Sequence, residues 1–190
     1  MSSFYSREEL ERIGFKSVGE NVLLSRKSSI YGPNDIIVGD NVRIDDFCIL
    51  SGKITIGSYV HIAAYVALYA GTAGIEMYNF SGISSKSIVY AITDDYSGLY
   101  MTNPTISSKF RAVQGAKVVI KKHAVIGANC TVLPGVTIEE GSAFGAMSLI
   151  NKDSTPWSLN AGCPFRKIKD RHKNIMLLEK EFMKEENQYE

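Results

Sequence analysis

The chain has 190 residues, enough for one ordinary domain with a small appendage. Its net charge of +1, with 22% charged residues, argues against a nucleic-acid surface or a polybasic membrane anchor. No apolar run approaches the roughly 20 residues of a membrane span, and the N-terminal stretch lacks a hydrophobic signal core. We therefore expect a cytoplasmic protein with no nucleic-acid partner.

The first predicted element is a short helix over residues 6–13 (SREELERI). Ser6 is suited to the N-cap position, and Glu9, three residues later, completes a capping box.

An apolar residue then recurs at every sixth position through most of the chain. Neither an α-helix nor a flat strand has this period, whereas a repeat architecture does. The residue four positions after each member is small or β-branched. Blocks of three repeats begin at Val18, Val38, Ile56, Met77, Ile120 and Ile138, with extra residues near 32–34 and 71–74 that we assign to turns. The members are Val18, Leu24, Ile30, Val38, Ile44, Leu50, Ile56, Ile62, Leu68, Met77, Ile83, Val89, Ile120, Ile126, Val132, Ile138, Phe144 and Ile150.

One six-residue unit is long enough for a short strand and a turn. Its apolar residue points inward, and three units close a triangular coil that buries its faces only against the coils above and below. The sequence therefore predicts an all-β protein of about six coils, with parallel strands between coils.

Two segments depart from the grid. Residues 95–117 lack it, and we expect a functional loop because long irregular loops are uncommon in compact domains. Residues 168–186 have helical spacing, with Ile168, Ile175, Leu178 and Phe182 on one stripe. We therefore divide the chain into a repeat domain, 1–168, and a helical tail, 169–190, that packs against the coils or a neighbouring subunit.

The three cysteines are odd in number and widely spaced. Cys48 and Cys130 fall at small inward positions of the repeat, which predicts buried thiols rather than a disulfide or a zinc site. We expect no metal.

Three units carry a family resemblance: Ile126-Gly-Ala-Asn-Cys-Thr, Ile56-Gly-Ser-Tyr-Val-His and Phe144-Gly-Ala-Met-Ser-Leu. They resemble the hexapeptide repeats of left-handed parallel β-helix acyltransferases, and residues 18–168 are most similar to bacterial galactoside and maltose acetyltransferases. The resemblance implies the left hand of the coil and acetyl-CoA as cosubstrate. It also implies a sugar acceptor and a homotrimer with its sites between subunits.

The general base is the point at which the chain departs from that family. Galactoside-type enzymes carry a histidine pair where this chain reads Thr93-Asp94-Asp95-Tyr96. We predict His61 with Asp95 as the base and His123 as the reserve, since an imidazole with a pKa near ~6.5 serves this role. The alternative is that both histidines are structural corner residues and that the two aspartates only turn the chain.

The remaining site residues follow from the loop and from the resemblance. Asp94, Tyr96 and Tyr100 are predicted to bind the acceptor, or else to pack against a neighbouring subunit. The family's pantetheine groove maps onto Ala128, Ala146, Asn151 and Lys152. The coenzyme phosphates map onto Arg166, which is otherwise an ordinary solvated residue.

These features favour acetyl transfer from acetyl-CoA to a sugar hydroxyl, in surface polysaccharide biosynthesis. N-acetyl transfer to an amino nucleotide-sugar is the alternative, and it requires less of a base because an amine is the stronger nucleophile. A non-catalytic scaffold would lack coenzyme A affinity. A γ-type carbonic anhydrase is disfavoured because it needs convergent zinc-binding histidines, whereas His61, His123 and His172 are dispersed.

Overall fold

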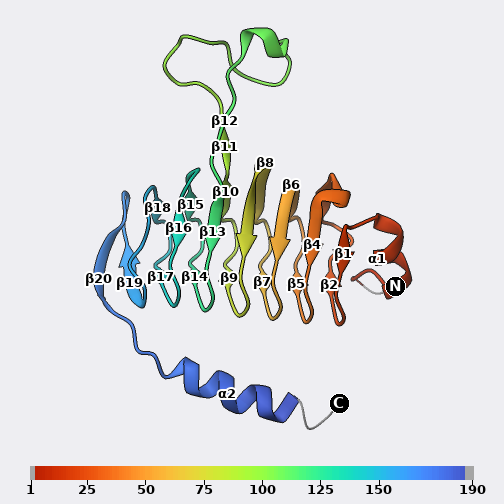
Figure 1. Cartoon of the computed structure of the whole chain (residues 1–190), viewed down its shortest axis with the longest axis vertical. Coiled ribbons are helices and arrows are strands. Elements are labelled where there is room, and N and C mark those ends of the chain that lie inside the picture. The colour runs from red at the N-terminus through yellow and green to blue at the C-terminus, as the bar shows by residue number, and fades with distance from the viewer. Residues whose placement is uncertain (1–2, 187–190) are drawn as a thin grey trace.

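Short parallel strands wind into a solenoid with three faces in the computed structural model, which describes residues 3–186 (Figure 1). The first face holds β1 (Ser17–Val18), β4 (Ile36–Val38), the second halves of β6 (Ile49–Ile56) and β8 (Ala67–Met77), β13 (Val118–Ile120) and β16 (Thr137–Ile138). The second holds β2 (Leu23–Leu24), β5 (Arg43–Ile44), β7 (His61–Ile62), β9 (Gly82–Ile83), β14 (Val125–Ile126), β17 (Ala143–Phe144) and β19 (Ser158–Ala161). The third holds β3 (Ser29–Tyr31), the first halves of β6 and β8, β10 (Ile88–Tyr90), β15 (Thr131–Val132) and β18 (Leu149–Ile150).

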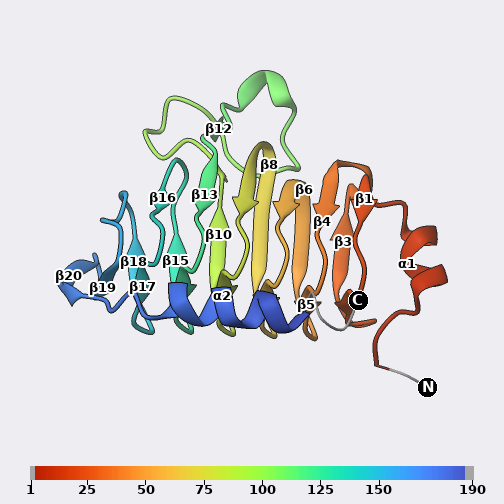
Figure 2. The same ribbon diagram turned by 60° about the horizontal axis from the view of Figure 1, so that its bottom comes forward.

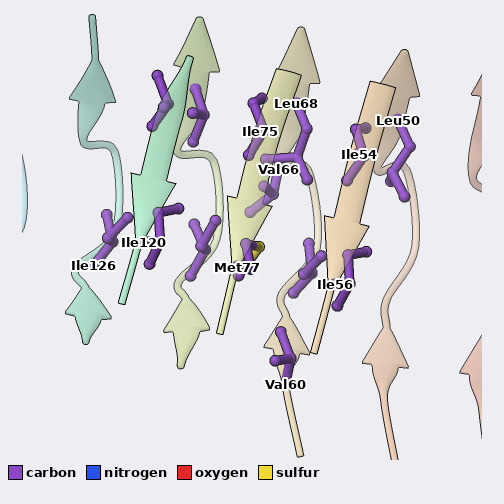
Figure 3. Close-up of a cluster of buried hydrophobic side chains, with 14 of the residues drawn as sticks. Leu50, Ile54, Ile56, Val60, Val66, Leu68, Ile75, Met77, Ile120 and Ile126 are labelled. Atoms are coloured by element: carbon purple, nitrogen blue, oxygen red, sulfur yellow. The ribbon is translucent and has the colours of Figure 1, made fainter. Parts of the chain in front are cut away.

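The core is a column of the predicted grid residues inside these faces. All of them are buried except Val18 and Ile30, which are partly buried. Figure 3 shows side chains of successive coils, among them Leu50, Leu68 and Ile120, stacked within the solenoid. The all-β parallel solenoid is therefore confirmed. The second face contains seven parallel strands, so the stack has about seven turns rather than six.

The N-terminal helix α1 (Arg7–Ile13) is also confirmed, together with its cap. The backbone N–H of Glu9 donates to Ser6 Oγ at 3.3 Å, and the Ser6 N–H donates to Glu9 Oε2 at 2.7 Å. Cys48 and Cys130 are buried free thiols, and burial raises the pKa of Cys48 to about 11.

The extra residues of the grid have two different fates. Those near 32–34 form the 3₁₀ turn η1 (Pro33–Asp35), as predicted. Those at 71–74 lie inside the continuous strand β8, where the register with β6 shifts between Ser51 and Ile54. That prediction of a turn was wrong, because a β-bulge absorbs added residues without ending the strand.

The C-terminal segment corrects the predicted helix. Residues Arg166–Asp170 form strand β20, antiparallel to β19, and helix α2 begins only at Ile175 and ends at Glu186. The seven-residue spacing between Ile168 and Ile175 fits a helix, but β19 presents free backbone groups with which β20 pairs. The predicted tail does pack against the coils (Figure 2). Among residues 3–186, no helix is long and apolar enough to cross a membrane.

Each coil turns with one residue in the left-handed region, and these residues stack into ladders. At the edge between the first and second faces, the aromatic members are Tyr59, Phe80, His123 and Trp157; we call this the aromatic edge. Gly141 occupies the position between His123 and Trp157, with φ +67°. Because Gly141 has no side chain, the Trp157 indole lies over it. The ring centroids of Trp157 and His123 are 6.2 Å apart.

We predict that Gly141→Ala lowers the free energy of unfolding more than Gly14→Ala does. Gly14 also has a positive φ (+84°), but an added methyl there meets no atom within 4 Å, so the expected cost is about 1 kcal/mol. At position 141 the methyl would overlap the Trp157 ring and add about 1–3 kcal/mol of overpacking. Urea denaturation of both variants measures the difference, and equal losses would contradict the role given to the missing side chain.

Candidate functional site

A protruding loop leaves the solenoid after the fourth coil (Figure 1). Its base is an antiparallel pair, β11 (Ile92–Thr93) with β12 (Gln114–Gly115), and its outer part contains the 3₁₀ turn η2 (Ser108–Phe110). The loop predicted over 95–117 is therefore present, but it is anchored by two short strands rather than irregular throughout.

The loop borders an open cavity of about 650 Å³. The three predicted acceptor-binding residues, Asp94, Tyr96 and Tyr100, all line it. Its other lining residues are Asp95, Gly98, Met101, Thr102, Asn103 and Ile106. The structure thus brings together the loop residues singled out from the sequence, and Asp94 gives the cavity a carboxylate.

Asp95 has a structural role at the base of this cavity. Its carboxylate accepts hydrogen bonds from Ser97 Oγ at 2.8 Å, from the Gly98 N–H at 3.0 Å and from the Tyr100 N–H at 3.3 Å. These bonds, that from Ser97 foremost, hold the pKa of Asp95 below its ordinary value despite the opposing effect of burial. A carboxylate that already accepts these hydrogen bonds is a weak proton acceptor. Asp95 therefore holds the start of the loop in shape, and we call it the clamp.

His61 pairs with a different aspartate from the one predicted. Its Nε2 lies 2.8 Å from Asp45 Oδ2, and Asp45 also accepts from Arg43 Nε at 2.7 Å. Figure 1 shows β7, which carries His61, on the side of the solenoid away from the loop. Within one chain, His61 therefore does not meet Asp95. Because alternate strand residues face outward, the His61 side chain remains half-exposed beside its new partner.

His123, the reserve base, is buried on the aromatic edge. Its ring stacks on Phe80 with centroids 5.5 Å apart, and its Nε2 lies 2.8 Å from Glu179 Oε2 of helix α2. Glu179 also accepts from Lys122 Nζ at 2.5 Å. Burial would raise the pKa of Glu179, but the bonds from Lys122 and His123 outweigh it and hold the pKa low. His123 is thus covered by α2 and serves to fasten that helix.

Helix α2 lies along the second face and the aromatic edge (Figure 2). The Phe182 ring meets the Tyr59 ring edge-on at 5.3 Å and the Phe80 ring at 6.2 Å. Within residues 3–186, no three His, Cys, Asp or Glu side chains converge on a point that could hold a metal ion.

The predicted coenzyme residues fall into two groups. Ala128 and Ala146 stack on successive coils at the edge between the second and third faces, since the Met147 N–H donates to the Ala128 carbonyl at 2.8 Å. Asn151 and Lys152 follow β18, at the other end of the third face. Lys152 Nζ lies 5.5 Å from the Phe165 ring, which places it beside Arg166. All three polar residues are exposed.

The edge that carries Ala128 and Ala146 also carries Ser84, which the sequence reasoning missed. Backbone hydrogen bonds one coil apart align Asp45, Ala63, Ser84, Gly127 and Gly145, and we call this ladder the serine edge. A signal was present in the repeat. Glycine follows the apolar residue at Ile126 and Phe144, but a serine follows Ile83.

Comparison with known proteins identifies the family. The model of bacterial transferase hexapeptide repeats (six repeats) matches residues 35–70 and 117–152. A dTDP-4-amino-4,6-dideoxy-D-glucose acyltransferase of Escherichia coli is 41% identical over 177 residues, covering 92% of this chain and 92% of that protein. WbbJ of Escherichia coli strain K12, named for O-acetyl transfer in lipopolysaccharide biosynthesis, is 30% identical over 88% of this chain and 78% of its own.

A solved structure of high similarity is AntD, an N-acyltransferase from Bacillus cereus, in complex with dTDP and 3-hydroxybutyryl-CoA. It is 57% identical, covers 98% of this chain and 100% of its own, and has a TM-score of 0.95. Its D94A variant was crystallised with dTDP and coenzyme A, and its S84A variant with dTDP-4-amino-4,6-dideoxyglucose and coenzyme A. The predicted coenzyme A cosubstrate is thus confirmed in a relative.

The clamp at Asp95 makes the loop sensitive to acid. Because the folded-state pKa of Asp95 is lowered, its stabilisation is present above the ordinary carboxyl value near 3.8 and is lost as the pH falls below it. The protection of the Gly98 and Tyr100 amides, taken as the ratio of intrinsic to observed hydrogen-exchange rates, should therefore fall below about pH 4. Asp95→Asn should show the same low protection at neutral pH, and protection unchanged by the substitution would contradict the clamp.

The predicted enzyme class agrees with these relatives. Both are acyltransferases, and both match this chain over nearly their whole length. The stacked coils of six-residue units and the matches over nearly the whole chain lead to one identification: this chain belongs to the family of bacterial hexapeptide-repeat transferases and is an acyltransferase.

Proposed function

We propose that this protein transfers an acyl group from acyl-CoA to the 4-amino group of a dTDP-linked 4-amino-4,6-dideoxy sugar. The observation that carries the proposal is the high identity to AntD over nearly the whole chain, since AntD binds both dTDP-4-amino-4,6-dideoxyglucose and coenzyme A. This chain has a serine and an aspartate at the two numbers substituted in AntD, Ser84 and Asp94. The acylated product would be a building block for a surface polysaccharide.

This proposal replaces the first choice made from the sequence. Acetyl transfer to a sugar hydroxyl was preferred there, with N-transfer to an amino nucleotide-sugar as the alternative, and the relatives favour the alternative. The chemistry agrees with the missing loop histidines. A neutral amine attacks a thioester without a base, whereas a hydroxyl needs its proton removed during attack.

The loop carboxylate Asp94 suits the amino group of such an acceptor. Its Oδ2 lies 3.4 Å from the Asn103 N–H, which leaves most of its hydrogen-bonding capacity for a ligand in the cavity. We assign Asp94 to hold the amine and accept the proton of its ammonium form. The neutral nitrogen then bonds to the thioester carbonyl carbon, the carbon–sulfur bond breaks, and the coenzyme leaves as a thiol with the proton that the nitrogen loses.

Ser84 and Asp94 lie at opposite ends of one face, so a second chain is needed to bring them together. Ser84 follows β9, Asp94 follows β11, and β10 lies between them. About five residues of extended chain separate the two edges, roughly 16 Å, too far for both side chains to touch one amino group. We propose a homotrimer in which Ser84 of one subunit faces Asp94 of the next.

We propose roles near this pair for several of the other predicted site residues. Ala128 and Ala146 continue the serine edge and would carry the pantetheine arm, with Lys152 and Arg166 toward the coenzyme phosphates. His61 lies on the adjoining face, and with its Asp45 partner it stays a candidate for shuttling the released proton.

The wild-type protein should release coenzyme A thiol with dTDP-4-amino-4,6-dideoxyglucose and react about 100-fold more slowly with dTDP-glucose, which has only hydroxyls. Asp94→Asn should lower kcat/KM for the amino sugar about 100-fold, because the amide accepts no proton. The matched control is Asp35→Asn, at an exposed carboxylate in the turn η1. Comparable rates with both sugars would refute N-transfer.

Co-expression of two inactive variants tests the shared site. In mixed oligomers of Ser84→Ala and Asp94→Ala, about one quarter of the interfaces combine an intact serine with an intact aspartate, so activity should return to that extent. If both residues act within one chain, every site retains a defect and no activity returns. Sedimentation of the mixture checks that oligomers form.

A further inference from the structure

One residue of the loop has a backbone conformation that is otherwise confined to the corners of the coils. Asn103 has a φ of +73°, in the left-handed region. Among the described residues other than glycine, every other member of that region lies where a coil turns. Asparagine tolerates this conformation better than most residues, but it still costs free energy, and residues held in this way often lie at functional sites. Asn103 therefore needs a reason other than the winding of the coils.

The turn around Asn103 is held by its own side chain. Asn103 Oδ1 accepts from the Thr105 N–H at 3.0 Å and from Thr105 Oγ1 at 2.5 Å. Pro104, which lies between them, has no N–H to donate. The Ile106 N–H donates to the Asn103 carbonyl at 3.4 Å. These bonds close a tight turn that keeps Asn103 in the left-handed region.

This turn directs the Asn103 N–H to Asp94, the carboxylate that we assign to the amine. The N–H donates to Asp94 Oδ2 at 3.4 Å, and both residues line the cavity of the loop. Within residues 3–186 it is the one hydrogen bond that the Asp94 carboxylate makes, whereas Asp95 beside it accepts from three residues of the loop. Hydrogen bonds of catalytic groups are often long before the substrate binds. The direction of the Asp94 carboxylate therefore depends on Asn103.

We infer that Asn103 is a positioning residue for acyl transfer: its left-handed backbone holds Oδ2 of Asp94 and so leaves Oδ1 for the amino group. The inference rests on the proposed function and adds to it the residue that orients the carboxylate. Orientation matters because a misplacement of about 1 Å can slow a reaction about 100-fold. Since Asn103 acts on Asp94 rather than on the ligand, its loss should lower kcat more than it changes KM.

Release of coenzyme A thiol with dTDP-4-amino-4,6-dideoxyglucose tests this role in two variants. Asn103→Val should lower kcat about 30-fold and change KM for the amino sugar less than about threefold, because a β-branched residue disfavours a positive φ and the N–H turns away. Asn103→Gly should keep kcat within about fivefold of the wild type, because glycine retains both the left-handed backbone and the N–H. Urea denaturation checks that the solenoid stays folded in both.

The matched controls are Asn21→Val and Asn21→Gly. Asn21 is an exposed asparagine with a φ of +53°, and it lies at a corner of the first coil. Because it bears the same backbone conformation away from the loop, both of its variants should keep the wild-type kcat and KM.

The outcomes separate this inference from the proposed function. A wild-type kcat in Asn103→Val, with the amino sugar acylated by the wild type, would overturn the positioning role alone. Equal losses in Asn103→Gly and Asn103→Val would also overturn it, because they would assign the effect to the side chain rather than to the direction of the N–H. A raised KM with an unchanged kcat would show that Asn103 contacts the acceptor instead. Failure of the wild type to acylate the amino sugar would overturn the proposed function and this inference together.

Discussion

Each strand of this solenoid takes its backbone hydrogen bonds from the coils directly before and after it, and the functional surfaces depend on that pairing. On the second face the register is regular, for example Ile44 with Ile62 and Ile62 with Ile83, so residues at equivalent positions form straight ladders. An edge of the molecule is thus a row of side chains about 4.8 Å apart. A ligand laid along an edge meets one residue from each coil, and the order of coils becomes the order of its binding groups.

The aromatic edge and the serine edge differ in whether another part of the chain covers them. The aromatic edge is occupied by helix α2, with Phe182 against Tyr59 and Glu179 bonded to His123 and Lys122. The serine edge has no such cover among the described residues. The same backbone geometry thus provides a helix-docking surface on one side and an open surface on the other.

The fold could be predicted closely from the sequence because the buried residues recur with its six-residue period. Almost every residue of the six-residue grid is in the core. The capping box joins Ser6 and Glu9, which are close in the sequence, so the sequence alone reveals it. The carboxylate partners could not be read in this way. Asp45 lies 16 residues before His61, and Glu179 lies 56 residues after His123, so only the coil register and the docking of α2 decide those pairs. Strand β20 was missed because its pairing with β19 is a tertiary contact, and such contacts override the helical spacing and helix propensity of a short segment.

Strand β20 also affects whether solenoids can associate end to end. A stack of parallel coils ends in a row of unpaired backbone groups, and identical stacks joined end to end would make a fibre. Because β20 runs antiparallel to β19, the last coil presents a reversed strand to an incoming coil. At the other end, helix α1 and the bridge between Phe4 and Ser25 occupy the start of the stack. Neither end of the stack therefore presents a bare parallel coil on its second face, which opposes the end-to-end joining of identical coils there.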